Sequence, residues 1–165
     1  MTDNFQTNLA LAFTNMSKSA ILLKLYARKV KREGKTSLTK VLSALAQSEN
    51  IHAHRSLMYL RGKVRNTNDY LDNLMKSKHN DAASEFPQLS KQLSRAGKKK
   101  AGETFEQFAS VASIHLRLLN EVLTGNISDS TNYYICQICG YIAKNEPPNN
   151  CPVCNAVKDK FKIEA

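Results

Sequence analysis

The segment YICQICGYIAKNEPPNNCPVCNAVKDKF, residues 134–161, contains all four cysteines of this 165-residue chain. The cysteines form two C-x-x-C pairs, and each pair fits a short turn that points both sulfur atoms to one side. Two such turns facing each other make a tetrahedral cage of four thiolates, which suits Zn(II) or iron at metal–sulfur distances of about 2.3 Å. The predicted ligands are Cys136, Cys139, Cys151 and Cys154.

The residues around the two pairs support a metal-binding turn. Gly140 follows the first pair, where a tight turn needs a residue that tolerates positive φ. Pro152 lies inside the second pair and stiffens it. The aromatic side chains of Tyr134, Tyr141 and Phe161 are expected to form a small apolar wall around the site.

Disulfides or four ordinary thiols are the alternative interpretation of the cysteines. No secretory signal peptide is recognisable at the start of the sequence, so we expect a reducing compartment, the cytoplasm, in which disulfides are disfavoured. The cysteine spacing favours metal binding. It fits a zinc ribbon as well as a rubredoxin-type Fe(Cys)4 centre and leaves the identity of the metal open.

The composition is that of a globular and strongly basic protein. Hydrophobic residues make up 42% of the chain, enough for a packed core, and the net charge is +10 with a pI of about 9.5. No apolar run approaches the roughly 20 residues that span a membrane, so no membrane association is expected. Because the basic residues are scattered over predicted helix faces, we interpret them as a solvated surface and do not expect nucleic acid as a partner. The densest cluster, residues 98–100, is predicted to lie in a loop between helices.

Apolar residues recur at helical spacing in the first 125 residues. The pattern predicts long helices over residues 4–32, 36–61, 70–96 and 103–123, and Pro87 should kink or interrupt the third. Four long amphipathic helices joined by mostly short loops favour a four-helix bundle. We therefore expect two domains, a bundle over residues 1–128 and a metal-binding domain over residues 132–165.

Three polar residues occupy positions in the predicted core stripes. Glu49 and His52 form an E-x-x-H pair on one face of the second helix, and His115 lies centrally on the stripe of the fourth. Charged and polar groups are costly in a bundle core unless they are paired or bind a metal. These residues are therefore either a hydrogen-bonded polar cluster or an actual or ancestral metal site.

The combination of a helical bundle and a CxxCG…CPxC module resembles the rubrerythrin family across essentially the whole chain. The resemblance includes AFTNMSKSAILLKLYA, AQSENIHAHR, EFPQLSK and FASVASIHLRLL, one segment in each helix, and the short 11-residue gap between Cys139 and Cys151. It implies a mainly α fold, with a ferritin-like four-helix bundle followed by a small rubredoxin-like domain. It also implies a homodimeric non-haem iron protein, in which a di-iron carboxylate site reduces peroxide and the rubredoxin-type iron supplies electrons.

Most of the family's di-iron ligands are replaced in this sequence. Glu49, His52 and His115 are kept, while the other family ligand positions carry Met16, Lys78, Asp81 and Ala112. Two carboxylates cannot offset the charge of two divalent ions, especially with a lysine beside them. The remaining possibilities are an empty, hydrogen-bonded core or a single ion bound by Glu49, His52, His115 and one of Asp81 or His79.

Three functions remain open at this point. The first is electron transfer through the Fe(Cys)4 centre to or from a redox protein partner, which a basic surface would help to dock if that partner is acidic. The second is peroxide reduction at a rebuilt metal site in the bundle, so whether the protein is an enzyme is left open. The third is a scaffold or binding protein with zinc in place of iron at the cysteines.

Overall fold

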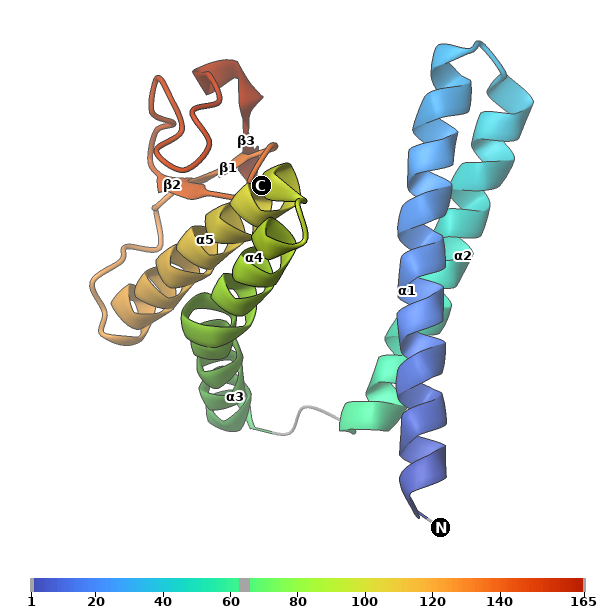
Figure 1. Ribbon diagram of the computed structural model, residues 1–165, viewed down its shortest axis with the longest axis horizontal. Helices are drawn as coiled ribbons and strands as arrows, with labels where there is room; N and C mark the ends of the chain where they lie inside the picture. Colours follow the sequence, from blue (N-terminus) through green and yellow to red (C-terminus); the bar gives the residue numbers. More distant parts are fainter. Residues whose placement is uncertain (1, 63–65, 165) are drawn as a thin grey trace. The chain divides into compact units, whose positions relative to one another are not determined.

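The computed structural model describes residues 2–62 and 66–164, and it consists of two compact units, Met1–Arg65 and Asn66–Ala165. Each unit is described by itself. The fold is mainly α, with long helices in both units and a small sheet near the C-terminus (Figure 1). No helix in these residues is long and apolar enough to cross a bilayer.

The first unit is a helical hairpin made of α1 (Thr2–Arg32) and α2 (Thr36–Arg61). The turn between them, residues 33–35, contains Gly34, whose φ of 74° is readily adopted only by glycine, and the Lys35 N–H donates to the Val30 carbonyl at 3.1 Å. The helices pack closely because small side chains meet between them. These fully buried residues are Ala20, Ala27, Ala46 and Ala53.

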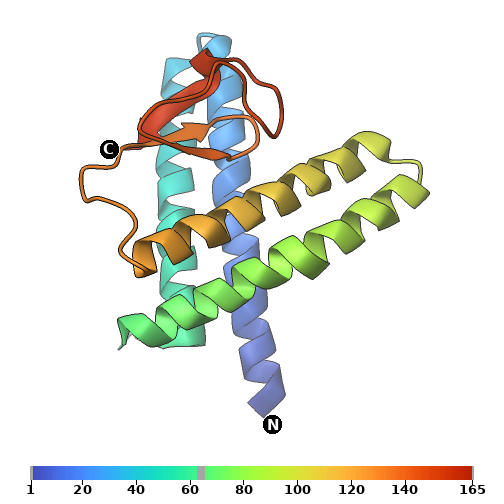
Figure 2. The ribbon, with the colours of Figure 1, turned by 90° about the vertical axis from the view of Figure 1, so that its left-hand side faces the viewer.

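The second unit begins with a long helical rod that contains one wide turn. It is formed by α3 (Thr67–Asn80), the π-helical segment η1 (Asp81–Glu85) and α4 (Phe86–Arg95), and it lies antiparallel to α5 (Lys99–Leu123) (Figure 2). Pro87 explains the wide turn, because it has no N–H and its ring clashes with an α-helical carbonyl four residues back. The Phe86 N–H instead donates to the carbonyl of Asp81, five residues earlier. The predicted interruption is therefore a π turn.

Two helix starts differ from the sequence prediction. The third helix begins at Thr67, three residues earlier than predicted, because the Asn66 side chain caps it by accepting a hydrogen bond from the Asn68 N–H at 2.9 Å. The last helix begins at Lys99, so Lys99 and Lys100 lie in its first turn and only Lys98 is in the loop. Gly97, with a φ of 75°, lies in the tight turn after α4, so α5 begins only two residues later.

A three-stranded antiparallel sheet forms the C-terminal part of the second unit. It consists of β1 (Tyr133–Cys136), β2 (Ile142–Lys144) and β3 (Phe161–Glu164), in the order β2-β1-β3. A 3-10 turn, η2 (Lys158–Lys160), precedes β3. Cys136 at the end of the central strand pairs with Phe161, so the sheet places the first cysteine beside an aromatic side chain.

Candidate metal centre

The first C-x-x-C pair lies in a tight turn closed by two backbone hydrogen bonds. The Cys136 N–H donates to the Tyr141 carbonyl at 2.8 Å, and the Gly140 N–H donates to the Cys136 carbonyl at 2.9 Å. Gly140 has a φ of 82°, which confirms the expectation that this position needs a residue tolerant of positive φ. The turn directs both of its cysteines toward the inside of the C-terminal module, where they are buried.

The second C-x-x-C pair repeats the same turn. The Cys151 N–H donates to the Ala156 carbonyl at 2.8 Å, and the Asn155 N–H donates to the Cys151 carbonyl at 2.8 Å. Asn155 takes the position that Gly140 has in the first turn, with a φ of 59°. Asparagine is among the few non-glycine residues that adopt this conformation readily. The two turns are thus equivalent cysteine knuckles.

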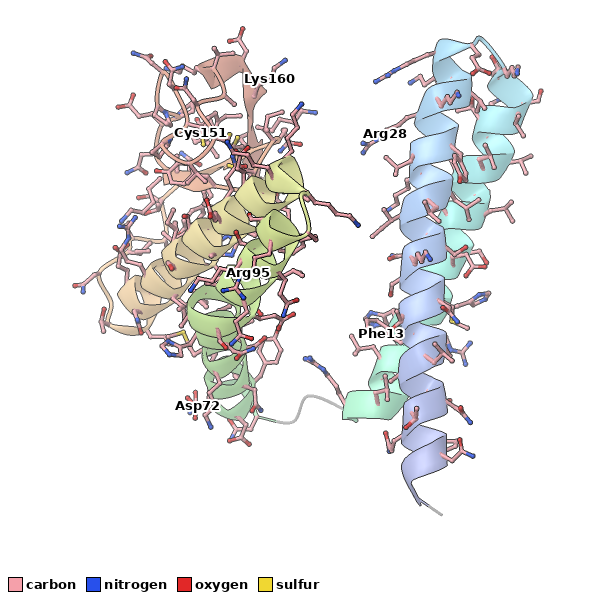
Figure 3. The ribbon with its side chains drawn as sticks, in the orientation of Figure 1. Phe13, Arg28, Asp72, Arg95, Cys151 and Lys160 are labelled. Carbon is pink, nitrogen blue, oxygen red and sulfur yellow. The ribbon has the colours of Figure 1, made fainter. Side chains whose placement is uncertain are left out.

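The knuckles bring the four sulfur atoms together. All four Sγ atoms lie within 4.8 Å of one another, and they cluster beside Cys151 in Figure 3. Two pairs across the knuckles are separated by 3.7 Å, between Cys136 and Cys154, and by 3.5 Å, between Cys139 and Cys151. A disulfide would need about 2.05 Å. A tetrahedron with metal–sulfur bonds of about 2.3 Å has edges of about 3.8 Å, so the cage fits one four-coordinate ion.

Backbone N–H groups point at the sulfur atoms and favour their thiolate forms. Burial alone would raise the pKa of the Cys136 thiol, but hydrogen bonds from the backbone of Cys139 and Ile138 hold that pKa below its usual value. Burial raises the pKa of the Cys139 thiol far above its usual range, although the Tyr141 backbone opposes the shift. Burial likewise raises the pKa of Cys154, with the Ala156 backbone opposing it. Such buried thiols need a cation to become thiolates.

The module and α5 share one hydrophobic core around the cysteines. Val111 of α5 is 5% exposed and packs in the same cluster as Cys136, Cys139 and Cys151. A Cβ placed on Gly140 would lie 3.9 Å from Cγ1 of Val111, so the first knuckle rests directly on the helix. The aromatic wall predicted from the sequence is present around this core. Its members are Tyr134, Tyr141 and Phe161, the last two in edge contact with ring centroids 6.2 Å apart.

An ion pair also joins the module to the end of α5. The Lys144 ammonium lies 2.6 Å from the Glu121 carboxylate, which is also 3.8 Å from Arg117. Neither this pair nor Val111 was predicted from the sequence. A signal for Val111 was present in the sequence, since Val111 and Leu118 are apolar, lie seven residues apart and fall beside the stripe assigned to the bundle core. A helix that is apolar on two faces packs on two partners.

The first unit holds two of the bundle candidates, Glu49 and His52, on one face of α2. In the hairpin by itself Glu49 is half-buried and His52 is exposed. Met16, at the family's first-helix glutamate position, accepts a hydrogen bond at its sulfur from the Ser56 hydroxyl at 3.5 Å. The methionine sulfur therefore contacts α2 at Ser56, one turn after His52.

The second unit holds the other candidates, Asp81 and His115. The Asp81 carboxylate accepts a hydrogen bond from the Lys78 ammonium at 2.7 Å, so the two residues at the family's third-helix positions form an ion pair with each other. His79, the alternative ligand, is exposed. Lys78 and His115 line a mostly apolar cavity of about 420 Å³ between α3, α5 and the sheet. The meeting of Glu49, His52 and His115 joins two units and stays a prediction.

His115 has an unusual environment for a polar side chain. Its Nε2 is the one buried side-chain nitrogen or oxygen in the described residues that has no hydrogen-bond partner. Burial lowers the pKa of the imidazole, the Gly140 backbone opposes that shift and the nearby Lys78 adds to it. His115 is therefore neutral at physiological pH and keeps a free ring nitrogen.

Comparison with known proteins agrees with the geometry. Residues 134–162 match the family described as rubrerythrin, rubredoxin-like domain. Rubrerythrin-2 of Clostridium acetobutylicum is 24% identical over 143 residues, which cover 76% of this chain and 78% of that protein. Nigerythrin of Nitratidesulfovibrio vulgaris is 30% identical over 80 residues, covering 46% of this chain and 38% of nigerythrin.

Solved structures extend the similarity to the whole fold. The mixed-valence and partially reduced states of nigerythrin match with TM-scores of 0.54 and 0.55 at 21% sequence identity, covering 96% of this chain and 86% of nigerythrin. These matches confirm the predicted fold class, a ferritin-like helical protein with a rubredoxin-like module. Together with the four-cysteine cage they support iron as the metal of this site. The chain is therefore an iron-binding protein that carries a rubrerythrin-type rubredoxin-like domain at residues 134–162 and is similar to rubrerythrins over most of its length.

Proposed function

We propose that this protein transfers single electrons through a rubredoxin-type centre and that its di-iron peroxidase site is largely lost. The ligands would be Cys136, Cys139, Cys151 and Cys154, and the observation that carries the proposal is the pair of equivalent knuckles that gathers their sulfur atoms. Iron held by four thiolates supplies a one-electron Fe(III)/Fe(II) couple. The backbone N–H groups aimed at Cys136 and Cys139 stabilise the negative charge of the thiolates. They are fixed by the knuckle turns, which suits a centre that gains or loses one electron without rearranging its ligands.

The residues at the family's di-iron positions support the loss of that site. Lys78 carries a positive charge where the resemblance implies a glutamate, and its ion pair occupies the carboxylate of Asp81. The side chains of Ala112 and Met16 have no oxygen that could bind a metal ion. The remaining carboxylates would therefore not neutralise the charge of two divalent ions, and the Lys78 ammonium would repel both ions.

The remaining polar residues Glu49, His52 and His115 are proposed to lie within hydrogen-bonding reach of one another, directly or through a water. His115 supports this because its neutral imidazole keeps one nitrogen without a partner in its own unit. The same nitrogen favours a second candidate function, peroxide reduction at a rebuilt site that binds one ion. In that case both histidines would bind through a ring nitrogen and Glu49 would supply charge.

The partner is proposed to be an acidic redox protein, since the chain carries a net charge of +10. Electron transfer would take place in the cytoplasm, where the cysteines stay reduced and available to the metal. The protein itself is proposed to act as a homodimer.

Elemental analysis and a visible spectrum of the purified protein test the proposal together. The expected result is one iron per chain, a red ferric form that bleaches on reduction and little hydrogen-peroxide reductase activity. Two or more irons per chain with peroxide turnover would overturn the loss of the di-iron site. A colourless protein with one zinc per chain would overturn electron transfer and favour a scaffold or binding protein.

The rebuilt-site alternative is tested by adding Zn(II) or Fe(II) to protein that already contains its cysteine-bound metal. Binding of one further ion per chain, lost in His115→Leu but kept in His79→Leu, would support it. His79 is a suitable control because it is exposed on α3. Failure to bind a further ion would leave the hydrogen-bonded cluster as the role of the three residues.

A further inference from the structure

The second cysteine knuckle contains a chain of two hydrogen bonds that ends on a sulfur atom. The Ala156 N–H is bonded to the Cys154 sulfur, where it opposes the rise that burial causes in the pKa of that thiol. The carbonyl of the same peptide group belongs to Asn155, and it accepts a hydrogen bond from the Asn150 side-chain amide at 3.4 Å. One planar peptide group therefore lies between a side-chain donor and a metal-binding sulfur.

The first knuckle contains the same chain, with a histidine as the side-chain donor. The Tyr141 N–H is bonded to the Cys139 sulfur and opposes the rise that burial causes in the pKa of this thiol. The carbonyl of that peptide group belongs to Gly140, whose backbone is hydrogen-bonded to the His115 imidazole. Burial lowers the pKa of His115 and this bond opposes the shift. Only a bond donated by the ring has that effect, so the acceptor is the Gly140 carbonyl.

The packing of α5 against the first knuckle explains how His115 reaches this carbonyl. Val111 lies one turn before His115 on the same face of the helix, and a Cβ placed on Gly140 would be 3.9 Å from Cγ1 of Val111. His115 also lines the mostly apolar cavity between α3, α5 and the sheet, together with Ile135 and Ile142. These two residues flank the first knuckle on either side. The imidazole therefore contacts the knuckle within largely apolar surroundings.

We propose that His115 is a positioning residue of the cysteine site, which polarises the peptide group between Gly140 and Tyr141 and so strengthens the hydrogen bond to the Cys139 sulfur. Hydrogen bonds in such chains strengthen one another, and the effect is larger where the local dielectric is low. The inference rests on the proposed electron transfer and deepens it, because hydrogen bonds to the sulfur atoms help to set the reduction potential. It also gives the histidine at a family di-iron position a role that needs no second metal.

The direction of the effect follows from charge. Reduction by one electron, which the redox partner supplies, adds one negative charge to the iron and its four thiolates. A stronger N–H···S bond stabilises the more negative form, because hydrogen bonds to charged groups strengthen with the charge. His115 therefore favours the ferrous site, and removal of its N–H should lower the reduction potential. The exposed Asn150 should have a smaller effect on the second knuckle.

Redox titration of the full-length protein, with iron loaded at the cysteines, tests the proposal. At the midpoint potential of the unmodified protein, the ratio of ferrous to ferric protein should fall about two- to threefold in His115→Leu, a shift of about 18–28 mV at 59 mV per tenfold change. His115→Gln keeps an N–H donor and should stay close to the unmodified protein, as should His79→Leu on the exposed side of α3. An unchanged midpoint in His115→Leu, or an equal fall in His115→Gln, would overturn the proposal. Zinc in the protein as purified, or peroxide turnover, would count against the proposed function and leave this comparison of iron-loaded variants intact.

The two knuckles provide a matched control within one protein. In the full-length protein loaded with Zn(II), which is diamagnetic, the amide proton shifts of Tyr141 and Ala156 report their hydrogen bonds to sulfur. His115→Leu should move the Tyr141 amide proton upfield and leave that of Ala156 in place, whereas Asn150→Ala should move only that of Ala156, and by less. An unmoved Tyr141 amide in His115→Leu would overturn the proposal. Equal movement of both amides would also overturn it, because it would show a general loosening of the module.

Discussion

At the scale of single residues, the metal site depends on backbone groups as much as on the cysteines. Each knuckle is closed by the same two hydrogen bonds, and each has a residue with positive φ just after its second cysteine, Gly140 in one and Asn155 in the other. The positive φ at Gly140 could be predicted from the CxxCG pattern, whereas the one at Asn155 was not predicted because CxxCN is not a familiar pattern. Four thiols held this close without a cation would bury polar groups and gain little.

Replacement of one cysteine should abolish the site. Cys139→Ser removes a buried sulfur that lies 3.5 Å from Cys151, and a neutral hydroxyl is a poor ligand for iron beside three thiolates. Iron per chain should fall at least tenfold and the ferric visible bands should disappear. Ile138→Ala is the control, since Ile138 lies next to Cys139 in the same knuckle but has an exposed side chain that offers no ligand. Equal iron content in the two variants would show that Cys139 is not a ligand.

A residue outside the cysteine module should also affect how tightly the module binds its metal. Val111→Ala removes two methyl groups from the core that α5 shares with the knuckles, at a cost of roughly 2 kcal/mol. Release of iron to a chelator under reducing conditions should become faster by about tenfold or more. The control is Ser110→Ala, because Ser110 is exposed and only donates to a carbonyl of its own helix. Identical release rates in both variants would contradict the shared core.

At the scale of elements, the sequence predicts helices well where apolar spacing is regular and less well where polar caps decide. The predicted ranges of α1 and α2 match the structure to within two residues, although the buried positions of α2 are Ala46 and Ala53 and not the predicted Leu45 and Tyr59. The start of α3 depends on the Asn66 side chain and the start of α5 on the turn at Gly97. The sequence prediction also assigned α5 to one core, whereas the structure shows that it serves two. Val111 and Ala112 are adjacent in sequence and both buried, and the spacing assigns only one of them to the bundle stripe.

The π segment offers a test of how the third helix is built. Deleting Ala83, an exposed residue in η1, in a Pro87→Ala background should convert the wide turn to a regular α turn while α3 and α4 keep their faces, because the proline ring that clashes with a regular α turn is then absent. We expect the free energy of unfolding to change by no more than about 1 kcal/mol. Deleting Ser113, also exposed but inside the regular helix α5, rotates buried Leu118 by about 100° and should cost more than about 2 kcal/mol. Equal losses in thermal unfolding would show that η1 is not an inserted turn.

At the scale of the whole molecule, the sequence predicts a boundary near residues 128–132, whereas the described contacts run across that position. Val111, His115 and Glu121 of α5 each interact with the module that follows the boundary, through a shared core, the Gly140 backbone and the ion pair with Lys144. A single sequence cannot reveal these contacts, because they depend on where the module folds back. The iron site and the end of α5 are therefore expected to be coupled.

Removal of the metal tests that coupling and the domain boundary together. The module has little core apart from its metal cage, so reduction in the presence of a strong chelator should leave residues 133–164 without hydrogen-exchange protection. α1, α2 and most of α3 and α4 should keep their protection, because none of their buried residues belongs to the cluster around the cysteines. In α5 the amides near Val111 should become less protected, while those near Phe105 and Phe108, which pack on Phe86 of α4, should not. Addition of Zn(II) should restore the pattern. A module that stays protected without metal would refute metal-dependent folding, and loss of protection throughout the helices would refute a boundary near residues 128–132.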